Sequence, residues 1–372
     1  MQLSAANQRP LRIAFRTDAS IQIGTGHVMR CLTLADALRA SGAETLFLCR
    51  PHPGHLLELI SGRGHHAVPL PAAEVAASPA QPAHTDWLGT TWALDAEHTR
   101  AAIGDEALDW LVVDHYAIDS RWEAALRPSC AALMVIDDLA DRPHDCDLLL
   151  DQNLGRRTKD YAGLLRPGTH VLVGPQNALL RPEFAQLRAE SLARRAHPQL
   201  EQVLITMGGV DKGNATGQVL DALDACSLPP QLRLTVVMGP HAPSLAQVQA
   251  RAARMSRQTR VLVGVTNMAR LMVDSDLAIG AAGSTSWERC CLGLPSFLLV
   301  LAANQSEAAA ALQDRGAAMV VQRVSEMINM LQTQLQSGNI GPFLQDMSLA
   351  TAKVTDGNGV AGIVRRLTAY HV

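Results

Sequence analysis

Aromatic residues are scarce in this chain: Phe, Trp and Tyr together make up 3% of its 372 residues. Its cores must therefore be built from Ala, Leu, Val and Ile, which favours helices and buried parallel strands over an aromatic-rich β-sandwich. An excess of one charge is also missing, because 32 basic residues stand against 35 acidic ones. We therefore expect no nucleic-acid partner, although a small anionic ligand needs only a few local donors.

The seven cysteines are scattered and include no CxxC pair. An odd count without paired spacing argues against a disulfide framework and a zinc site. We predict no metal ligand in the site and no cofactor. No apolar run reaches the ~18 residues that a spanning helix needs, and the N-terminus lacks an apolar signal core. We therefore predict a cytoplasmic protein without a membrane partner. The oligomeric state stays open.

The length of the chain favours two domains over one. Short apolar runs alternate with helical patterns, which predicts parallel sheets joined by right-handed crossovers. The expected strands are residues 11–15, 45–49, 110–114, 133–137, 148–150, 170–173, 202–207, 232–238, 260–263, 276–280 and 296–300.

The alternation pauses over residues 175–198, a charged stretch with prolines at both ends. We therefore predict an α/β protein with two doubly wound, Rossmann-like domains facing a cleft. The first covers 1–175, a linker with its own helix covers 176–199, and the second covers 200–372. Ligands of such sheets bind beyond the carboxyl ends of the strands, so the loops after strands are the places to search.

The loop after the first predicted strand reads RTDASIQIGTGH and leads into a helix. Gly24 and Gly26 permit a tight turn close to a ligand. His27 begins the helix, where the helix field favours a neutral ring that can act as a base. Asp18 is the predicted partner of its second nitrogen. The alternative is a capping His without chemistry, and a dinucleotide motif fails because Met29 replaces its last glycine.

Three loops of the second half also follow predicted strands: MGGVD at 207–211, GAAGSTSWE at 280–288 and AANQ at 302–305. In the middle loop, small residues let the backbone approach a pyrophosphate, and Ser284 and Thr285 supply donors at a helix N-terminus. Glu288 is placed to accept both hydroxyls of a ribose. The alternative makes Ser284 an ordinary N-cap and Glu288 a capping-box acid, worth roughly 1 kcal/mol.

Together these segments resemble one known family. RTDASIQIGTGHVMRCLTLADAL, DHY at 114–116, IDDLADRPHDCDLLLDQN, MGGVDKGN, and AIGAAGSTSWERCCLGLP with ANQ after it are similar to the UDP-2,4-diacetamido-2,4,6-trideoxy-β-L-altropyranose hydrolases of pseudaminic acid biosynthesis. The likeness covers about residues 11–320. A wider resemblance links the chain to GT-B glycosyltransferases of the MurG type.

The resemblance implies that a histidine base activates a water, which attacks the anomeric carbon and releases UDP with inversion and without a metal. The GSTSWE segment would hold UDP, with its glutamate on the ribose. The implied residues are His27 as the base; Arg16, Asp18, Gly26, Tyr116 and Asn304 for the sugar; and Gly208, Gly209, Gly283, Ser284, Thr285 and Glu288 for UDP.

Two other functions stay open. An inverting UDP-sugar glycosyltransferase of the same fold would use an acceptor hydroxyl in place of water. A non-catalytic protein would bind the UDP-sugar without turnover. The segment after about residue 338 carries no motif that matches a function.

Overall fold

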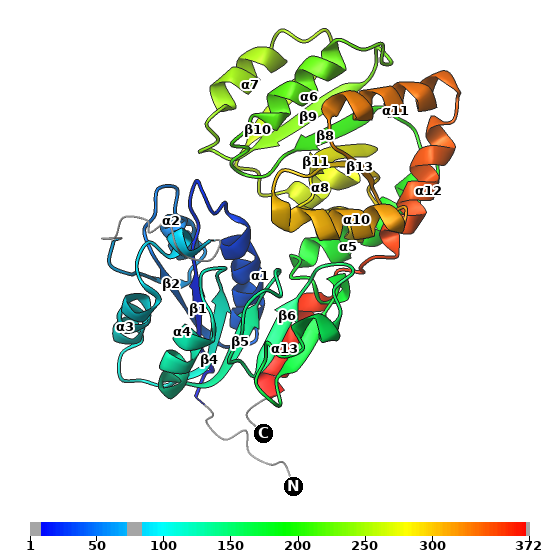
Figure 1. The fold of residues 1–372 in the computed structure, drawn as a ribbon. Coiled ribbons are helices and arrows are strands. Elements are labelled where there is room, and N and C mark those ends of the chain that lie inside the picture. The colour runs from blue at the N-terminus through cyan, green and yellow to red at the C-terminus, as the bar shows by residue number, and fades with distance from the viewer. Residues whose placement is uncertain (1–8, 73–83, 370–372) are drawn as a thin grey trace. The chain divides into compact units, whose positions relative to one another are not determined.

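The structure is a computed structural model that describes residues 9–72 and 84–369. It divides into two compact units, each with one sheet (Figure 1). Unit 1 comprises Met1–Asp151, Arg157–Leu172 and Val360–Val372, and unit 2 comprises Gln152–Arg156 and Val173–Gly359. In the described ranges no helix combines the length and apolarity needed to cross a bilayer.

Unit 1 holds a seven-stranded sheet in the order β3-β2-β1-β4-β5-β6-β7, and the pairings from β3 to β6 are parallel. The strands are β1 (Arg12–Thr17), β2 (Glu44–Cys49), β3 (His66–Pro69), β4 (Leu108–Asp114), β5 (Cys130–Ile136), β6 (Leu148–Asp151) and β7 (His170–Val173). The helices are α1 (Gly26–Ala40), α2 (Leu57–Gly62), α3 (Trp92–Ile103), α4 (Ser120–Leu126) and α13 (Gly359–Ala369), with 3-10 turns η1 (Thr85–Leu88), η2 (Arg127–Ser129) and η3 (Thr158–Tyr161).

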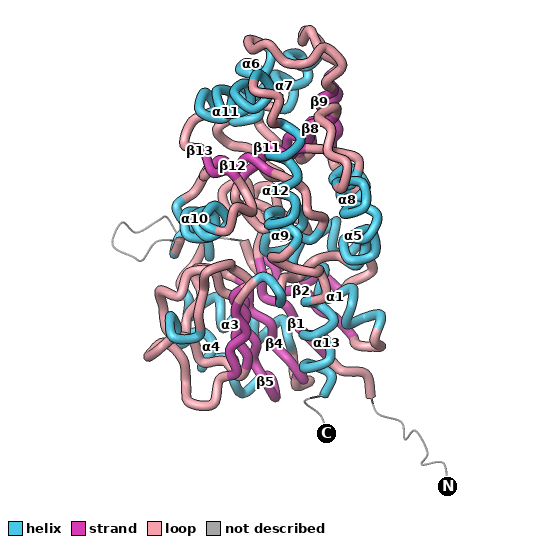
Figure 2. Tube along the Cα trace, turned by 90° about the vertical axis from the view of Figure 1, so that its right-hand side faces the viewer, coloured by secondary structure: helices cyan, strands magenta, loops and turns pink. Residues whose placement is uncertain are grey.

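The side chains of strand β4 lie alternately on the two faces of the unit 1 sheet. All residues of β4 are buried. Leu111 and Val113 pack with the apolar side chains of α3 and α4. On the other face the Trp110 indole donates to the Leu367 carbonyl of α13, and Asp114 meets α1. Figure 2 shows the helices on both sides of these strands.

Unit 2 holds a six-stranded parallel sheet in the order β10-β9-β8-β11-β12-β13. The strands are β8 (Gln202–Thr206), β9 (Arg233–Met238), β10 (Thr259–Val263), β11 (Leu277–Ala281), β12 (Ser296–Leu299) and β13 (Met319–Val321). The helices are α5 (Pro182–Arg195), α6 (Ala215–Asp224), α7 (Leu245–Ala252), α8 (Met268–Val273), α9 (Thr285–Cys291), α10 (Ser306–Asp314), α11 (Val324–Gln336) and α12 (Ile340–Ala352), with 3-10 turns η4 (Pro175–Asn177) and η5 (Ala303–Gln305).

Two apolar clusters bury the faces of the unit 2 sheet. One joins β8, β9 and β11 to α6, α7 and α11, through side chains such as Ile205, Val219 and Leu331. The other joins the opposite faces of the strands to α5, α8, α9 and α10, through side chains such as Phe184 and Trp287. Because helices cover both faces of the sheet, its strands consist mostly of apolar residues. Such apolar runs can be recognised in the sequence.

The predicted fold class, with two doubly wound Rossmann-like halves, is confirmed, and every predicted strand overlaps an observed one. The short edge strands β3 and β13 were not predicted. The predicted linker over 176–199 contains α5, whose Phe184 lies in the core of unit 2. The predicted second domain ran to residue 372, whereas the chain returns to unit 1 at Val360.

Candidate active site and nucleotide site

In unit 1 the strand order reverses between β1 and β4, because β2 and β3 extend the sheet on one side and β5 to β7 on the other. Such a switch point opens a crevice at the carboxyl ends of the two strands. Thr17, the last residue of β1, pairs in register with Asp114, the last residue of β4. The loop after β1 leads to His27, the second residue of α1, so both side chains meet at this point.

His27 and Asp114 form a short hydrogen-bonded pair. The ring Nδ1 lies 2.6 Å from Asp114 Oδ1, and the His27 side chain is 10% exposed. A carboxylate at this distance favours the tautomer with its proton on Nδ1, which leaves Nε2 as an acceptor. In the described part of the chain no residue hydrogen-bonds to Nε2. The arrangement is that of a base oriented by an acid.

Arg30 fixes the carboxylate that orients His27. It lies one helical turn after His27 and donates to both oxygens of Asp114, at 2.6 and 2.7 Å. Burial by itself would raise the pKa of Asp114, but the Arg30 guanidinium and His27 outweigh it and hold this pKa well below its usual range. Asp114 is therefore an anion at neutral pH.

The same arginine connects the base to a second side chain of the site. Arg30 Nη1 lies 2.7 Å from Asp138, and that carboxylate accepts a 2.8 Å hydrogen bond from the Tyr116 hydroxyl. The Tyr116 ring meets the His27 ring edge-on, with centroids 4.6 Å apart. Two predicted residues, His27 and Tyr116, therefore lie side by side.

Two rings that the sequence did not single out complete this group. Trp87 stacks on Tyr116 with centroids 5.5 Å apart, and His84 lies 4.4 Å from Trp87. His84 has a positive φ of 74°, which is uncommon for a residue other than glycine. The cluster stands out because aromatic residues make up only 3% of the chain.

Asp18, the predicted partner of His27, has other partners. It forms an ion pair with Arg16 at 2.8 Å and accepts a hydrogen bond from the backbone N–H of Arg50. His115 Nε2 lies 3.3 Å from its other oxygen. The prediction that Asp18 orients His27 was wrong, because β4 brings Asp114 to the end of β1 and Asp18 turns toward β2.

Arg16 lies in a buried charge network below the loop. Asp95 of α3 accepts hydrogen bonds from Arg16 and Arg50 at 2.8 and 2.6 Å, and from the Trp122 indole at 2.9 Å. Burial opposes ionisation of Asp95, but Arg16 and Arg50 outweigh it and lower its pKa. Arg16, Arg50 and Asp95 are each at most 1% exposed. This network fixes the backbone that precedes His27.

We expect Asp95→Asn to lower the free energy of unfolding by about 3–5 kcal/mol, because it leaves two buried guanidinium groups short of a counter-charge. Urea denaturation measures this loss. Because the folded-state pKa of Asp95 is lowered, its contribution is present above about pH 4 and is lost as the pH falls. Glu97→Gln, at an exposed position of the same helix, is the control and should stay within about 0.5 kcal/mol. An equal loss in both variants would contradict this account.

In unit 2 the order reverses between β8 and β11, and β12 follows β11. The three predicted loops therefore leave three neighbouring strands at one edge of the sheet. Gly208 has φ +95° with open space where a Cβ would point. A side chain at Gly239 would strike the Gly209 carbonyl oxygen, so two loops approach each other here through bare backbone. The edge is built from small residues, as an anion-binding loop requires.

The two helices that start at this switch point differ in their N-termini. The Asp211 carboxylate of unit 2 accepts the N–H groups of Ala215 and Thr216, so α6 already has an anion at its start. Ser284, which precedes α9, makes no side-chain cap and is exposed. The start of α9, in contrast to that of α6, therefore has no side-chain cap from its N-cap residue.

Glu288 lies on α9 behind this loop, with its side chain 18% exposed. Burial raises its pKa to about 7, and Arg181, whose Nη2 is 3.7 Å away, opposes the shift. Arg289 is buried beneath the loop and donates to the Ala281 carbonyl at 2.7 Å. The Glu288 carboxyl group therefore changes its protonation state near neutral pH.

The remaining predicted residues lie at exposed positions. Asn304 is in η5, which follows β12, and Gly26 is the first residue of α1. Gln305, beside Asn304, reaches back with its side-chain oxygen to the N–H of Leu301 at 3.0 Å and closes this loop.

Comparisons with known proteins bear on the fold and on the family resemblance. Residues 202–358 match the glycosyltransferase family 28 C-terminal domain. The chain is similar to the UDP-2,4-diacetamido-2,4,6-trideoxy-beta-L-altropyranose hydrolase of Campylobacter jejuni, at 26% identity over 306 residues, which are 82% of this chain and 97% of that protein. It is also 28% identical over 151 residues to a spore coat polysaccharide biosynthesis protein of Bacillus subtilis, which covers 41% of this chain and 43% of that one.

Among solved structures, MurG of Acinetobacter baumannii aligns with a TM-score of 0.66 over 97% of this chain and 100% of its own, at 17% identity. At that identity the likeness concerns the fold. The predicted resemblances to the hydrolase and to the MurG-type GT-B fold are both confirmed.

Proposed function

We propose that this protein hydrolyses a UDP-sugar at the anomeric carbon, in the cytoplasm, as a step of pseudaminic acid biosynthesis. His27 Nε2 takes a proton from water while the water oxygen attacks the anomeric carbon. The bond from that carbon to the UDP oxygen breaks, and UDP leaves with the electron pair. Attack from the face opposite UDP inverts the anomeric configuration.

The observation that carries this proposal is the 2.6 Å pair of His27 and Asp114 at the switch point of unit 1. Asp114 holds the tautomer that a general base needs, and its negative charge stabilises the imidazolium formed during attack. The alternative, a capping histidine without chemistry, does not account for the buried carboxylate on Nδ1, which Arg30 in turn holds in place.

We assign UDP to the carboxyl edge of the unit 2 sheet. The backbone donors of Gly283–Thr285 would hold the pyrophosphate, Gly208 and Gly209 would let the nucleotide approach, and Glu288 would accept the ribose hydroxyls. Stabilising the charge that develops on the leaving UDP is the main contribution expected from such a site. The match of this region to a glycosyltransferase C-terminal domain supports the assignment.

The sugar that we propose is a 2,4-diacetamido-2,4,6-trideoxy hexose, the type named in the Campylobacter relative. Tyr116, beside His27, and Asn304, in the loop after β12, are the proposed sugar contacts. Arg16 and Asp18 are fully buried, so we propose that they shape the sugar site from beneath the loop. Gly26 would keep the entrance of α1 clear of a side chain.

Proton NMR of the purified protein with candidate UDP-sugars tests this function. We expect UDP and free sugar to appear with no acceptor present, and the first anomer formed to have the inverted configuration. Retention of configuration, or no turnover of any such UDP-sugar, would contradict the proposal.

The family 28 domain match favours a second candidate, an inverting glycosyltransferase. That enzyme would release UDP only when an acceptor hydroxyl is supplied, so the same NMR assay without acceptor separates the two. A non-catalytic UDP-sugar-binding protein would bind UDP but show no turnover under either condition.

The proposed role of Glu288 predicts pH-dependent nucleoside binding. With a pKa of about 7, the carboxylate loses its charge as the pH falls, so uridine should bind about tenfold more weakly at pH 6 than at pH 8. Glu288→Gln should weaken binding about 10–100-fold at pH 8, since bonds to a charged acceptor are worth about 1.5–3 kcal/mol. Isothermal titration with uridine avoids the titration of the UDP phosphates.

Glu190→Gln, at an exposed site on α5, is the matched control and should keep the wild-type profile. If Glu288→Gln retains both the wild-type affinity and its pH dependence, Glu288 does not contact the ribose.

A further inference from the structure

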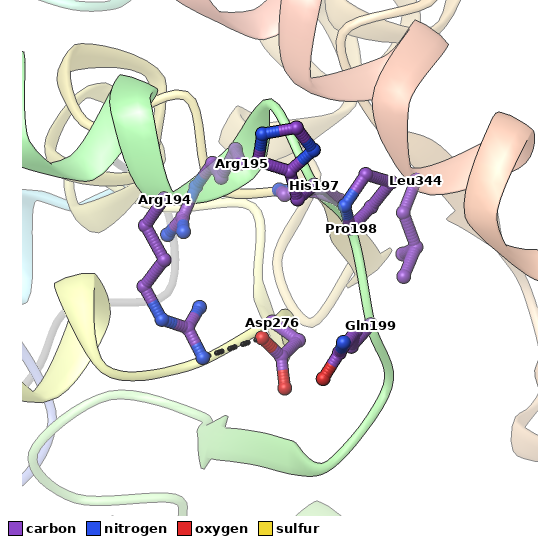
Figure 3. Close-up of a pocket in the computed structure, with 8 residues that line it drawn as sticks. Arg194, Arg195, His197, Pro198, Gln199, Asp276 and Leu344 are labelled. Atoms are coloured by element: carbon purple, nitrogen blue, oxygen red, sulfur yellow. Dashed lines mark ion pairs between the residues drawn. The ribbon is translucent and has the colours of Figure 1, made fainter.

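A cavity of about 210 Å³ lies in unit 2, where the chain passes from α5 to β8 (Figure 3). The ion pair drawn there joins Arg194 to Asp276, at 2.6 Å. Asp276 also accepts two backbone N–H groups, and Arg195 is buried with its Nη2 donating to the Met272 carbonyl at 2.9 Å. These charged groups are engaged within the protein. The aromatic group beside His27 in unit 1 offers a ligand more, because part of its surface is open to water.

Trp87 and His84 are the half-buried members of that aromatic group. The Tyr116 ring, on which the Trp87 indole stacks at an interplanar angle of 20°, is only 5% exposed. Most of the ring surface that the group can present to a ligand therefore belongs to Trp87 and His84.

The 3-10 turn η1 fixes the position of Trp87. Leu88, the next residue, is fully buried in the apolar cluster that includes side chains of α3 and α4. The backbone N–H of Trp87 donates to the His84 carbonyl at 2.9 Å and closes the turn. Because Leu88 takes the buried position, its neighbour Trp87 stays half-buried, with its indole against Tyr116.

The Trp87 indole borders the proposed base. Its ring centroid lies 6.3 Å from that of His27, and the two planes meet at 74°. The Nδ1 side of the His27 ring faces the fully buried Asp114, so the exposed part of this side chain lies away from that carboxylate. A sugar held with its anomeric carbon at a water on Nε2 therefore has Trp87 within reach.

The chemistry of this surface suits the apolar parts of a sugar. An indole is a large, rigid apolar face with one polar N–H at its edge. Burial lowers the pKa of His84, so its ring is uncharged at neutral pH. A 2,4-diacetamido-2,4,6-trideoxy hexose carries methyl groups at C6 and on its acetamido groups, where common hexoses carry hydroxyls. Such methyl groups match an aromatic face better than hydroxyls do.

We propose that Trp87 determines the specificity of the sugar site, with its indole in contact with a methyl group of the sugar. The contact selects a deoxy, acetamido sugar over a hexose with hydroxyls at the same positions. This inference rests on the proposed function, because the sugar must lie at His27 for Trp87 to reach it. His84 and Tyr116 support the indole, at centroid distances of 4.4 and 5.5 Å.

Relative kcat/KM values test the contact. The UDP-linked diacetamido sugar is compared with two analogues, one with a hydroxymethyl group at C6 and one with a hydroxyl at C4. The wild type should prefer the diacetamido sugar over at least one analogue by about 10–200-fold, the usual worth of one small apolar group in a pocket. Trp87→Ala should remove most of that preference, and Trp87→Phe, which keeps an aromatic face, should retain most of it. The analogue concerned identifies the methyl group.

Trp92→Ala is the matched control. Trp92 is another half-buried tryptophan of unit 1, on α3, with the Arg121 guanidinium 5.4 Å from its ring centroid. Its loss should cost stability and leave the substrate preference at the wild-type value. A Trp87→Ala variant that keeps the wild-type preference against both analogues would overturn the proposal.

Fluorine NMR of the full chain labelled with 5-fluorotryptophan gives a second readout that needs no turnover. Among the signals of the five tryptophans, the one missing from Trp87→Phe belongs to Trp87. In the slow variant His27→Asn, the UDP-sugar should shift this signal more than UDP alone does. A shift without turnover by the wild type would refute hydrolysis and support the contact. Turnover with no such shift would refute the contact and leave hydrolysis standing.

Discussion

Replacing His27 by Asn should lower kcat for UDP-sugar hydrolysis by about 10²–10⁴-fold, the usual contribution of a general base. The change removes the acceptor that takes the proton from water and keeps a side chain able to hydrogen-bond to Asp114. UDP affinity should stay at the wild-type value, because the proposed nucleotide residues all belong to unit 2. NMR of sugar release gives kcat, and titration with UDP gives the affinity.

His170→Asn, at an exposed position of β7, is the matched control for this experiment. We expect it to turn over like the wild type. Added imidazole should restore part of the activity of His27→Asn, since it can enter the space left by the ring. Unchanged turnover in His27→Asn with normal UDP binding would show that the assigned base is wrong.

Replacing Asp114 by Asn should have the next largest effect, a loss of up to about 10⁴-fold in kcat. The corresponding change in the Ser-His-Asp triad has that magnitude, because the amide stabilises the wrong tautomer of the histidine. Here Asp114 does not touch the reacting atoms, so its contribution passes through His27 Nδ1. The double variant His27→Asn/Asp114→Asn should therefore be no slower than His27→Asn alone.

Asp114→Asn also removes the negative charge to which Arg30 donates two hydrogen bonds. Because the buried Arg30 then loses this counter-charge, we expect the free energy of unfolding to fall by about 3–5 kcal/mol. Rates must therefore be measured where denaturation curves show both proteins to be folded. Asp138→Asn is the informative comparison, since it weakens the hold on Arg30 and Tyr116 but leaves the Nδ1 contact in place. A kcat loss in Asp138→Asn equal to that in Asp114→Asn would mean that destabilisation, and not the tautomer, accounts for the effect.

The sequence predicts the sheets of this protein well because their central strands are buried on both faces. Such strands contain continuous apolar runs, as in residues 110–113 of β4 and in β11. The strands that were missed lie at sheet edges. In β3 (HAVP) no residue is buried, and β13 has three residues with one buried. Half-exposed edge strands carry neither a long apolar run nor a clean alternation, so a single sequence gives no signal for them.

The candidate site was predictable one loop at a time, but its pairings were not. His27 and Tyr116 were named from their motifs, and they are neighbours in the structure. The partner of His27 was assigned to Asp18 because it is near in sequence, whereas Asp114 is 87 positions away. The sheet order places β1 beside β4, and this pairing brings the DHY segment to the start of α1.

Arg195 marks another limit of sequence analysis. In the printed sequence it is one arginine of the ARRAHP segment, in a stretch that reads as a charged linker. Its burial follows from the packing of α5 in unit 2, with Phe184 in the core. Whether a charged residue on such a helix faces water or protein is decided by contacts that are distant along the chain.

The return of α13 to unit 1 has a consequence for the protein as it is being made. The Trp110 indole of β4 donates a hydrogen bond to the Leu367 carbonyl, which lies 257 positions later in the chain. A ribosome adding about 5–20 residues per second takes on the order of ten to forty seconds to pass through unit 2 before it reaches this helix. Throughout that time the nascent unit 1 has a bare sheet face where α13 will dock. The first unit to begin folding is therefore the last to be completed, and a fragment that stops after unit 2 should require chaperones to remain dispersed.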